Sequence, residues 1–213
     1  MSNNKHRNLL IIANGQPPAA KILQHLIRET DLIIAVDGGS TICYHNHIQP
    51  DYIVGDLDSI PAEVSEHFKN AKLIYRPDQN FHDLEKAIEF AQSLNPQIIK
   101  IAAAFGKRAD QTLANLLTLQ SKFNQVPLEF YDDFGRLEII SGSRQLMLPV
   151  GQVISLFSFL PVYGITLQGF EYTVGAADYP HGFNGLSNVI ARQPAQISIK
   201  HGALYLYTLL IHD

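Results

Sequence analysis

Residues 51–59 read Asp-Tyr-Ile-Val-Gly-Asp-Leu-Asp-Ser, and this stretch predicts a strand followed by an acidic turn and a helix. The run 52–54 is typical of a short buried strand, and the glycine after it lets the chain turn sharply. Side chains two residues apart in an extended chain point to the same side, so Asp56 and Asp58 should converge where the strand ends. Ser59, with a proline two positions later, is typical of a helix start.

Two converging carboxylates suit a hard cation such as Mg²⁺, which is commonly bound through one or two carboxylates, several waters and substrate phosphates. The same residues also fit an ordinary solvated turn, because Asp, Gly and Ser are common turn residues. The motif alone therefore leaves a metal site and a plain turn both open.

The composition indicates a chain that can form a substantial hydrophobic core and that carries a slight net negative charge. The protein has 213 residues, 46% of them hydrophobic, and a formal net charge of −4, which argues against a nucleic-acid-binding surface. Cys43 is the only cysteine, so no intrachain disulfide is possible. Because no apolar run approaches the length of a membrane span, we expect a soluble cytoplasmic protein with no membrane or nucleic-acid partner.

Short apolar runs alternate with helical segments over the first part of the chain. Strands are expected at residues 9–13, 32–36, 52–54, 72–75, 98–103 and 127–131. Between the fourth and fifth runs, apolar side chains repeat at helical spacing, at Leu84, Ala87, Ile88, Ala91 and Leu94. This alternation predicts βαβ units and hence a mostly parallel sheet covered by helices on both faces, an α/β/α domain.

Near Gly135 the pattern changes to short strands separated by Gly and Pro turns. Strands are expected at residues 137–140, 145–148, 153–160, 164–167, 172–174, 196–200 and 203–210. His201-Gly202, between the last two, indicates a two-residue hairpin. We infer a small antiparallel sandwich or barrel, and we divide the chain into an α/β domain at residues 1–138 and an all-β domain at residues 139–213.

Most of the unusual polar residues follow predicted strands of the first domain. They are Asn14, Gln16, Asp37, Asp56, Asp58, Asp78, Gln79, Lys107, Arg108 and Asp110. In an open α/β sheet, ligands bind beyond the carboxyl ends of the strands, where helix N-termini and basic side chains favour phosphate. The acids need a cation to share a site with phosphate, so the pattern predicts a metal–nucleotide site. In the competing interpretation, each acid only caps a helix or solvates a loop.

These motifs resemble those of the thiamine pyrophosphokinase family in order and spacing. They are Val36-Asp37-Gly38-Gly39, Gly55-Asp56-Leu57-Asp58-Ser59, Asp78-Gln79 followed by Asp83-Leu84 and Lys86-Ala87, Gly106 with Arg108, Asp110 and Asn115, and the C-terminal pair Ser187-Asn188. The resemblance implies an α/β catalytic domain, a C-terminal β-sandwich that binds thiamine and forms a homodimer, and transfer of pyrophosphate from ATP to the thiamine hydroxyl.

On this resemblance the polar residues receive roles at an ATP–Mg²⁺ site. Asp56, Asp58 and Asp83 would hold Mg²⁺ against the ATP phosphates. Arg108 would orient phosphate oxygens, and Asp110 would be a further metal-side acid or the base for the incoming hydroxyl. The remaining residues assigned to ATP binding are Asn14, Asp37, Gly38, Gly39, Ser59, Asp78, Gln79 and Lys107.

The resemblance also assigns a thiamine site to the C-terminal domain. Ser187 and Asn188 would hydrogen-bond the aminopyrimidine, although a Ser-Asn pair is also an ordinary loop sequence. Tyr172, where the family often has Trp, would stack on the cationic ring system. In a dimer, the C-terminal domain of one chain would complete the site of the other. His82 stands where the family usually has Thr.

Two other functions compete with this interpretation. An Asp-x-Asp turn also occurs in phosphohydrolases with an aspartyl nucleophile, but there it generally follows the first strand, whereas here it follows the third. A non-catalytic module would bind Mg²⁺ and nucleotide without turnover, although binding alone rarely needs so many acids.

Overall fold

The computed structural model describes residues 7–58, 60–78 and 80–210, and it forms two compact units, Met1–Asp133 and Phe134–Asp213. The sequence placed the boundary between residues 138 and 139, which is five residues too late. Strand β7 (Gly135–Ile140) pairs along its whole length with β14 (Leu204–Leu209), so residues 135–138 belong to the second unit.

The first unit contains a parallel sheet with the strand order β6-β5-β1-β2-β3-β4. The strands are β1 (Asn8–Ile12), β2 (Leu32–Val36), β3 (Tyr52–Gly55), β4 (Lys72–Tyr75), β5 (Ile98–Ala102) and β6 (Leu128–Tyr131). The central strands β1, β2 and β5 are buried along nearly their whole length, as their continuous apolar runs predict. The prediction of a mostly parallel sheet is confirmed.

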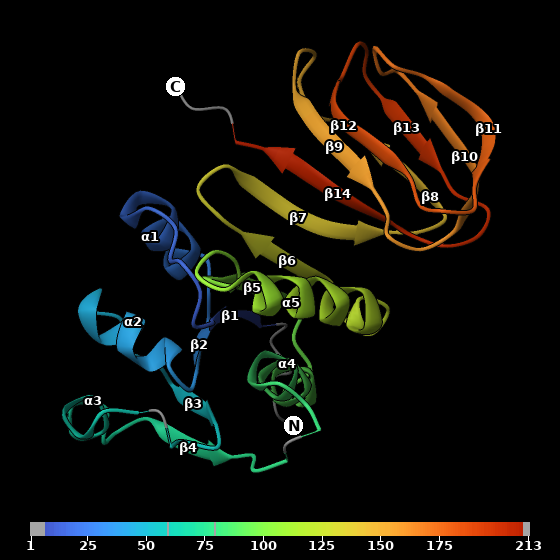
Figure 1. The fold of residues 1–213 in the computed structure, drawn as a ribbon. Helices are drawn as coiled ribbons and strands as arrows, with labels where there is room; N and C mark the ends of the chain where they lie inside the picture. The colour runs from blue at the N-terminus through green and yellow to red at the C-terminus, as the bar shows by residue number, and fades with distance from the viewer. Residues whose placement is uncertain (1–6, 59, 79, 211–213) are drawn as a thin grey trace, which may run out of the picture. The chain divides into compact units, whose positions relative to one another are not determined.

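Helices cover both faces of this sheet (Figure 1). One face carries α1 (Ala20–Arg28), α2 (Gly39–His45) and α3 (Ala62–His67), whose apolar side chains share a core with Leu10 and Ile12 of β1. The other face carries α4 (Asp83–Ser93) and α5 (Ala109–Lys122). Strand β1 lies between β2 and β5, because the chain adds β2, β3 and β4 on one side of β1 and then β5 and β6 on the other. The crevice beyond its carboxyl end is the expected ligand site of such a sheet.

The second unit is a β-sandwich, and the antiparallel β-rich domain predicted from the sequence is confirmed. One sheet has the order β12-β9-β14-β7 and the other β11-β10-β13-β8. The further strands are β8 (Ser143–Leu146), β9 (Val153–Phe157), β10 (Val162–Gln168), β11 (Val174–Tyr179), β12 (Asn184–Val189) and β13 (Ala195–Ser198). Buried side chains of both sheets, including Leu156, Leu206, Ile165 and Ile197, form one core.

Three details of the second unit differ from the sequence prediction. The strand predicted at residues 172–174 begins only at Val174 and runs to Tyr179. Strands β13 and β14, which flank His201-Gly202, lie in different sheets, so the predicted hairpin is wrong. The chain crosses between the sheets there, and His201 forms an isolated bridge with Tyr163. Strand β12 was not predicted, because its glycine and its polar residues interrupt the alternation of apolar side chains.

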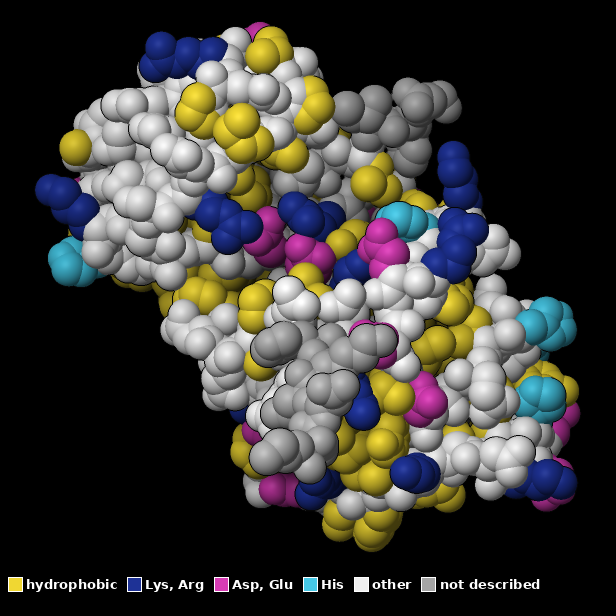
Figure 2. Space-filling model, turned by 180° about the vertical axis from the view of Figure 1, so that it is seen from behind, with side chains coloured by type: hydrophobic (Ala, Val, Ile, Leu, Met, Phe, Trp, Pro, Cys, Tyr) yellow, Lys and Arg dark blue, Asp and Glu magenta, His cyan; other side chains and the backbone are white. Residues whose placement is uncertain are grey.

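The surface mixes charges of both signs. On the face seen in Figure 2, basic and acidic side chains are interspersed rather than gathered into separate areas. This arrangement agrees with the net charge of −4. Among the described residues, no helix is both long enough and apolar enough to cross a membrane.

Candidate active site

Three carboxylates gather at the carboxyl edge of the parallel sheet. Asp37, Asp56 and Asp58 each offer an oxygen, and these oxygens all lie within 4.8 Å of one another. The sheet brings them together, because β2 and β3 are parallel neighbours with Val36 beside Val54, so the turns after both strands lie at the same edge. The backbone N–H of Asp37 donates to the carbonyl of Val54 at 3.0 Å, which holds one turn against the next strand.

Glycine at position 55 lets these turns approach each other. A Cβ at Gly55 would lie 2.9 Å from the Cβ of Asp37, closer than real side chains pack, and the φ of Gly55 is +159°. Leu57, between the two acids of the second turn, has a positive φ of 64°, a conformation that is costly for a branched side chain and is held by the surrounding turn.

This donor set fits a hard divalent cation. Three carboxylates from two adjacent turns supply the oxygen ligands that Mg²⁺ prefers, and Asp56 and Asp58 reach solvent, which leaves room for waters or phosphate oxygens. The sequence prediction named Asp56 and Asp58 as the cation group but gave Asp37 only a role in nucleotide binding. The signal for Asp37 was its place directly after the neighbouring buried strand.

Asp83, the third predicted metal ligand, is engaged differently. It is the first residue of α4, and its Oδ1 accepts a hydrogen bond from Nζ of Lys86 at 3.0 Å. The Lys86 side chain is only 6% exposed, so a buried ammonium group holds the carboxylate of Asp83 in place. Asp83 still lines the pocket described next, although it is outside the group of three carboxylates.

A pocket opens beyond the carboxyl ends of β1, β2 and β5, at the point where the strand order reverses. It encloses about 130 Å³, and its lining includes Asn14, Asp37, Gly38, His82, Asp83 and Asn115. Asn115 is buried on α5, and its Nδ2 donates to the carbonyl of Ala104 in the turn after β5. Residues at the starts of α4 and α5 therefore form part of the pocket wall, together with the turns after β1, β2 and β5.

The turns around this pocket pack closely against one another. A Cβ at Gly39 would lie 2.2 Å from the carbonyl oxygen of Ile12, and a Cβ at Gly38 would lie 2.3 Å from Nδ2 of Asn14. Only glycine fits at position 39, where the neighbouring atom is backbone, whereas at position 38 the Asn14 side chain would have to move. Lys107, in the turn after β5, donates to the carbonyl of Asn14 at 3.1 Å and so brings a positive charge to the turn after β1.

Arg108 and Asp110 form a two-bond pair at the start of α5. Nε and Nη2 of Arg108 donate to the two carboxylate oxygens of Asp110 at 3.1 Å and 2.5 Å. Hydrogen bonds from Arg108 and from the backbone N–H of Gln111 lower the pKa of Asp110. Both side chains are well exposed, so the pair orients the guanidinium without adding much stability.

Asp78, of the predicted Asp78-Gln79 box, is engaged locally. Asp78 accepts hydrogen bonds from the backbone and side-chain nitrogens of Asn80, at 2.9 Å and 2.8 Å, within its own turn. Ser59 and Gln79 lie outside the described residues.

In the second unit, Asn188 holds the backbone of Tyr172. Its Oδ1 accepts from the Tyr172 N–H at 3.1 Å, and its Nδ2 donates to the Tyr172 carbonyl at 2.8 Å. Asn188 is 3% exposed, whereas the side chain of Tyr172 is 69% exposed. The Asn188 side chain therefore holds the loop that presents Tyr172. Most of its hydrogen-bonding groups are already used in this way, which leaves few for the predicted contact with a ligand.

Ser187 lies in an irregular part of β12. The pairing of β12 with β9 shifts register between Gly185 and Asn188, and Ser187 has a positive φ of 55°. Its backbone N–H donates to Oγ of Ser155 at 3.0 Å, while its side chain is exposed. The bulge thus presents the hydroxyl of Ser187 to solvent beside the exposed Leu186.

Two family models match the chain, one for each unit. The model described as thiamin pyrophosphokinase, catalytic domain, matches residues 23–130. The model described as thiamin pyrophosphokinase, vitamin B1 binding domain, matches residues 140–204. The chain belongs to the thiamin pyrophosphokinase family.

Relatives and solved structures of thiamin pyrophosphokinases agree with this assignment. The Bacillus subtilis thiamine pyrophosphokinase is 23% identical over 209 residues, covering 94% of this chain and 97% of that protein. Thiamin pyrophosphokinase 1 of Caenorhabditis elegans is 27% identical over 153 residues, covering 67% of this chain and 58% of that protein.

The fold is shared with solved members of the family. The structure of the enzyme from Bacillus subtilis superimposes with a TM-score of 0.81 at 23% identity, covering 95% of this chain and 99% of that one. The structure from Candida albicans gives a TM-score of 0.83 at 19% identity, covering 98% of this chain and 90% of that one. The resemblance found in the sequence motifs is thereby confirmed at the level of family and fold.

The family models also separate the predicted residues by unit. The acidic turns, Lys107, Arg108 and Asp110 fall within the catalytic-domain match, while Tyr172, Ser187 and Asn188 fall within the vitamin B1 binding-domain match. Asn14 precedes the matched range, but it lines the same pocket as Asp37 and Asp83. Thr118, which hydrogen-bonds His82 from 36 residues away, was not predicted as a site residue.

Proposed function

We propose that this protein transfers a pyrophosphoryl group from ATP to the hydroxyl of thiamine, giving thiamine diphosphate and AMP in a Mg²⁺-dependent reaction. The observation that carries the proposal is the group of Asp37, Asp56 and Asp58, which follow β2 and β3 at the carboxyl edge of the parallel sheet, in a chain of this family. Such a group holds a cation where a parallel sheet receives nucleotide phosphates.

The first unit has to neutralise the charge of the ATP phosphates and align the reacting groups. Phosphoryl-type transfer needs an in-line arrangement of the attacking oxygen, the phosphorus and the leaving group more than it needs covalent help from the protein. Asp37, Asp56 and Asp58 hold Mg²⁺, and the bound ion supplies Lewis-acid polarisation of the phosphate oxygens. Lys107 and Arg108 bring donors to phosphate oxygens from the turn after β5.

Asp110 orients Arg108 rather than taking the proton of the thiamine hydroxyl. A carboxyl whose pKa is lowered is a weak base, and efficient general bases have a pKa near the working pH. Its two hydrogen bonds with Arg108 fix the guanidinium fork in one direction. Asp83, held by Lys86, supplies an oriented carboxylate at the edge of the pocket.

The second unit binds thiamine in this proposal. Tyr172 presents an exposed aromatic face to the cationic ring system, and Ser187 offers a hydroxyl to the aminopyrimidine. Asn188 keeps the Tyr172 backbone in place. We further propose a cytoplasmic homodimer in which the second unit of one protomer serves the site of its partner. Sedimentation of the purified protein at twice the monomer mass tests the dimer.

A product assay tests the reaction. Purified protein is incubated with ATP, Mg²⁺ and thiamine, and the nucleotides and thiamine esters are separated. AMP and thiamine diphosphate should appear together and only when thiamine is present. ADP with thiamine monophosphate would instead mean transfer of a single phosphoryl group. ATP binding without thiamine-dependent turnover would favour a non-catalytic binding module.

A further inference from the structure

His82 and Thr118 connect α4 to α5 next to the pocket. His82 occupies the N-cap position of α4, but it makes no side-chain capping hydrogen bond among the described residues. Its Nε2 lies 2.5 Å from Oγ1 of Thr118 on α5 instead. Thr118 is 4% exposed, so its hydroxyl is shielded from water that would compete for the imidazole.

His82 belongs to the lining of the pocket, whereas Thr118 does not. Asp37 and Asn115 are part of the same lining. Asn115 and Thr118 are three residues apart on α5, which places them on the same side of the helix. The hydrogen bond therefore holds the ring against the side of α5 that also supplies Asn115 to the pocket.

The chemistry of the pair suits a fixed ring. A threonine hydroxyl both donates and accepts, so it can hydrogen-bond Nε2 of His82 in either tautomer of the imidazole. The second ring nitrogen, Nδ1, is not part of this hydrogen bond.

We propose that Thr118 is a positioning residue that fixes the His82 ring as a wall of the nucleotide pocket, so that the pair sets the affinity for ATP. The proposal rests on the proposed function, since it takes ATP as the occupant of this pocket. Thr118 acts only through His82, so removing its hydroxyl should affect nucleotide binding and leave thiamine binding unchanged.

Thr118→Val and Thr118→Ser test the pair in the full-length protein. Valine keeps the shape and removes the hydroxyl, and serine keeps the hydroxyl. For Thr118→Val we expect a KM for ATP raised about three- to tenfold, the effect of one lost hydrogen bond. The KM for thiamine should stay the same, and Thr118→Ser should stay near wild type. ATP binding in the absence of thiamine, measured by calorimetry, should weaken by the same factor.

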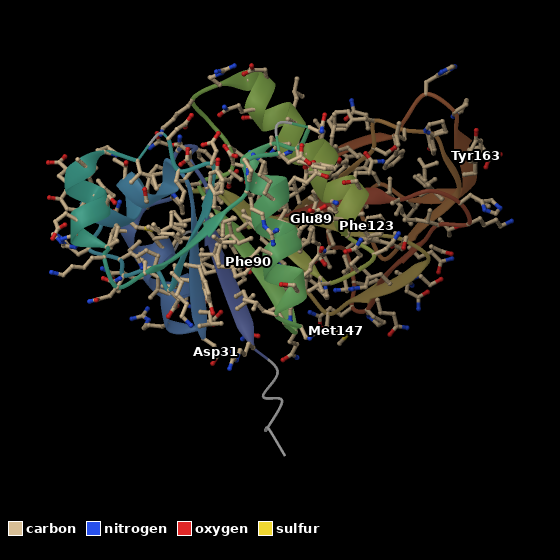
Figure 3. All side chains as sticks on the ribbon, turned by 90° about the horizontal axis from the view of Figure 1, so that it is seen from below. Asp31, Glu89, Phe90, Phe123, Met147 and Tyr163 are labelled. Atoms are coloured by element: carbon tan, nitrogen blue, oxygen red, sulfur yellow. The ribbon has the colours of Figure 1, made fainter. Side chains whose placement is uncertain are left out.

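Lys122→Gln is the matched control. Lys122 also joins α4 to α5, through ion pairs with Glu85 at 3.2 Å and Glu89 at 2.7 Å (Glu89 is labelled in Figure 3). It is outside the pocket lining, so the substitution should lower the melting temperature without a selective rise in the KM for ATP. An equal rise in both variants would mean that the pair only supports helix packing, which would overturn the proposal.

A variant that does not fold and a protein that makes no thiamine diphosphate can each be distinguished from a failure of the positioning role. If Thr118→Val does not fold, as judged by circular dichroism, His82→Ala replaces it and should raise the KM for ATP by a similar factor. An unchanged KM for ATP in that variant would contradict the proposal. If the wild-type protein makes no thiamine diphosphate, the proposed function fails, and ATP calorimetry on the same variants still decides whether the pair positions the nucleotide.

Discussion

The acids at positions 37, 56 and 58 lie close together because the turns that carry them meet at one edge of the sheet. Two of them were predicted as a cation group from their spacing in an extended chain. The third needed the knowledge that β2 and β3 are neighbours, which no local pattern contains. Lys86 likewise looks like a surface residue of an amphipathic helix, yet it is buried under Asp83. Local spacing thus predicts which side chains share a turn, but not which turns meet.

Asp56→Asn and Asp58→Asn should each lower the Mg²⁺-dependent turnover by about a hundredfold or more, because the cation loses a charged ligand at the point where phosphate charge develops. Steady-state rates as a function of Mg²⁺ concentration measure the effect. Circular dichroism should show an unchanged fold. Glu66→Gln, at an exposed acid of α3, is the control and should behave as wild type. Near-wild-type rates in both aspartate variants would show that Asp56 and Asp58 do not bind the catalytic cation.

Asn188→Ala should raise the KM for thiamine several-fold and leave the KM for ATP unchanged. The substitution removes the two hydrogen bonds that fix the Tyr172 backbone, so the exposed ring loses its fixed direction. Kinetics with each substrate varied in turn measure the effect. Gln193→Ala removes another side-chain bond to a loop carbonyl, that of Leu148, and serves as the control. Equal changes in both KM values would argue for a general loss of structure.

At the scale of elements, the sequence predicts the alternating strands and helices of the first unit well. Apolar runs of four or five residues and helical periodicity are local signals, and the parallel sheet follows from them. The errors are at elements whose partners are not local. The His201-Gly202 turn looks like a hairpin from its residues, although its flanking strands belong to different sheets. Strand β12 was missed because it contains a bulge.

Gly39→Ala should destabilise the first unit by about 1–3 kcal/mol, because a Cβ there would lie 2.2 Å from the backbone oxygen of Ile12, which has no room to move. Chemical denaturation measures the free energy of unfolding. Gly175→Ala is the matched control, since a Cβ at Gly175 meets nothing within 4 Å. A loss in Gly39→Ala no larger than in the control would show that β1 and α2 can separate without cost.

Glu29→Gln should lower the stability at neutral pH, and the difference from wild type should shrink in acid. Lys100 of β5 hydrogen-bonds Glu29 at the end of α1 and lowers its pKa below the ordinary 4.5. Because the folded pKa is the lower one, this stabilisation is complete above pH 4.5 and is lost as the pH falls through the folded value. Melting temperatures of both proteins across this range measure it. A constant difference would contradict the ion pair.

At the scale of the whole molecule, composition and motifs predicted two units of different class, and the family models match one unit each. The boundary was placed late because β7 begins directly after the last strand of the first unit, without a linker of distinct composition. The polar residues of the first unit belong to one edge of its sheet, as the rule for open α/β sheets predicts. The reaction proposed for the whole chain is the transfer of both terminal phosphates of ATP to thiamine.

ATP labelled at the α-phosphate distinguishes transfer of two phosphates from transfer of one. The labelled nucleotide is incubated with enzyme, Mg²⁺ and thiamine, and the label is followed through one turnover. Pyrophosphoryl transfer predicts label in AMP, one AMP for each thiamine diphosphate, and no labelled ADP at any time. Label that accumulates in ADP, or AMP that forms without thiamine, would contradict the account.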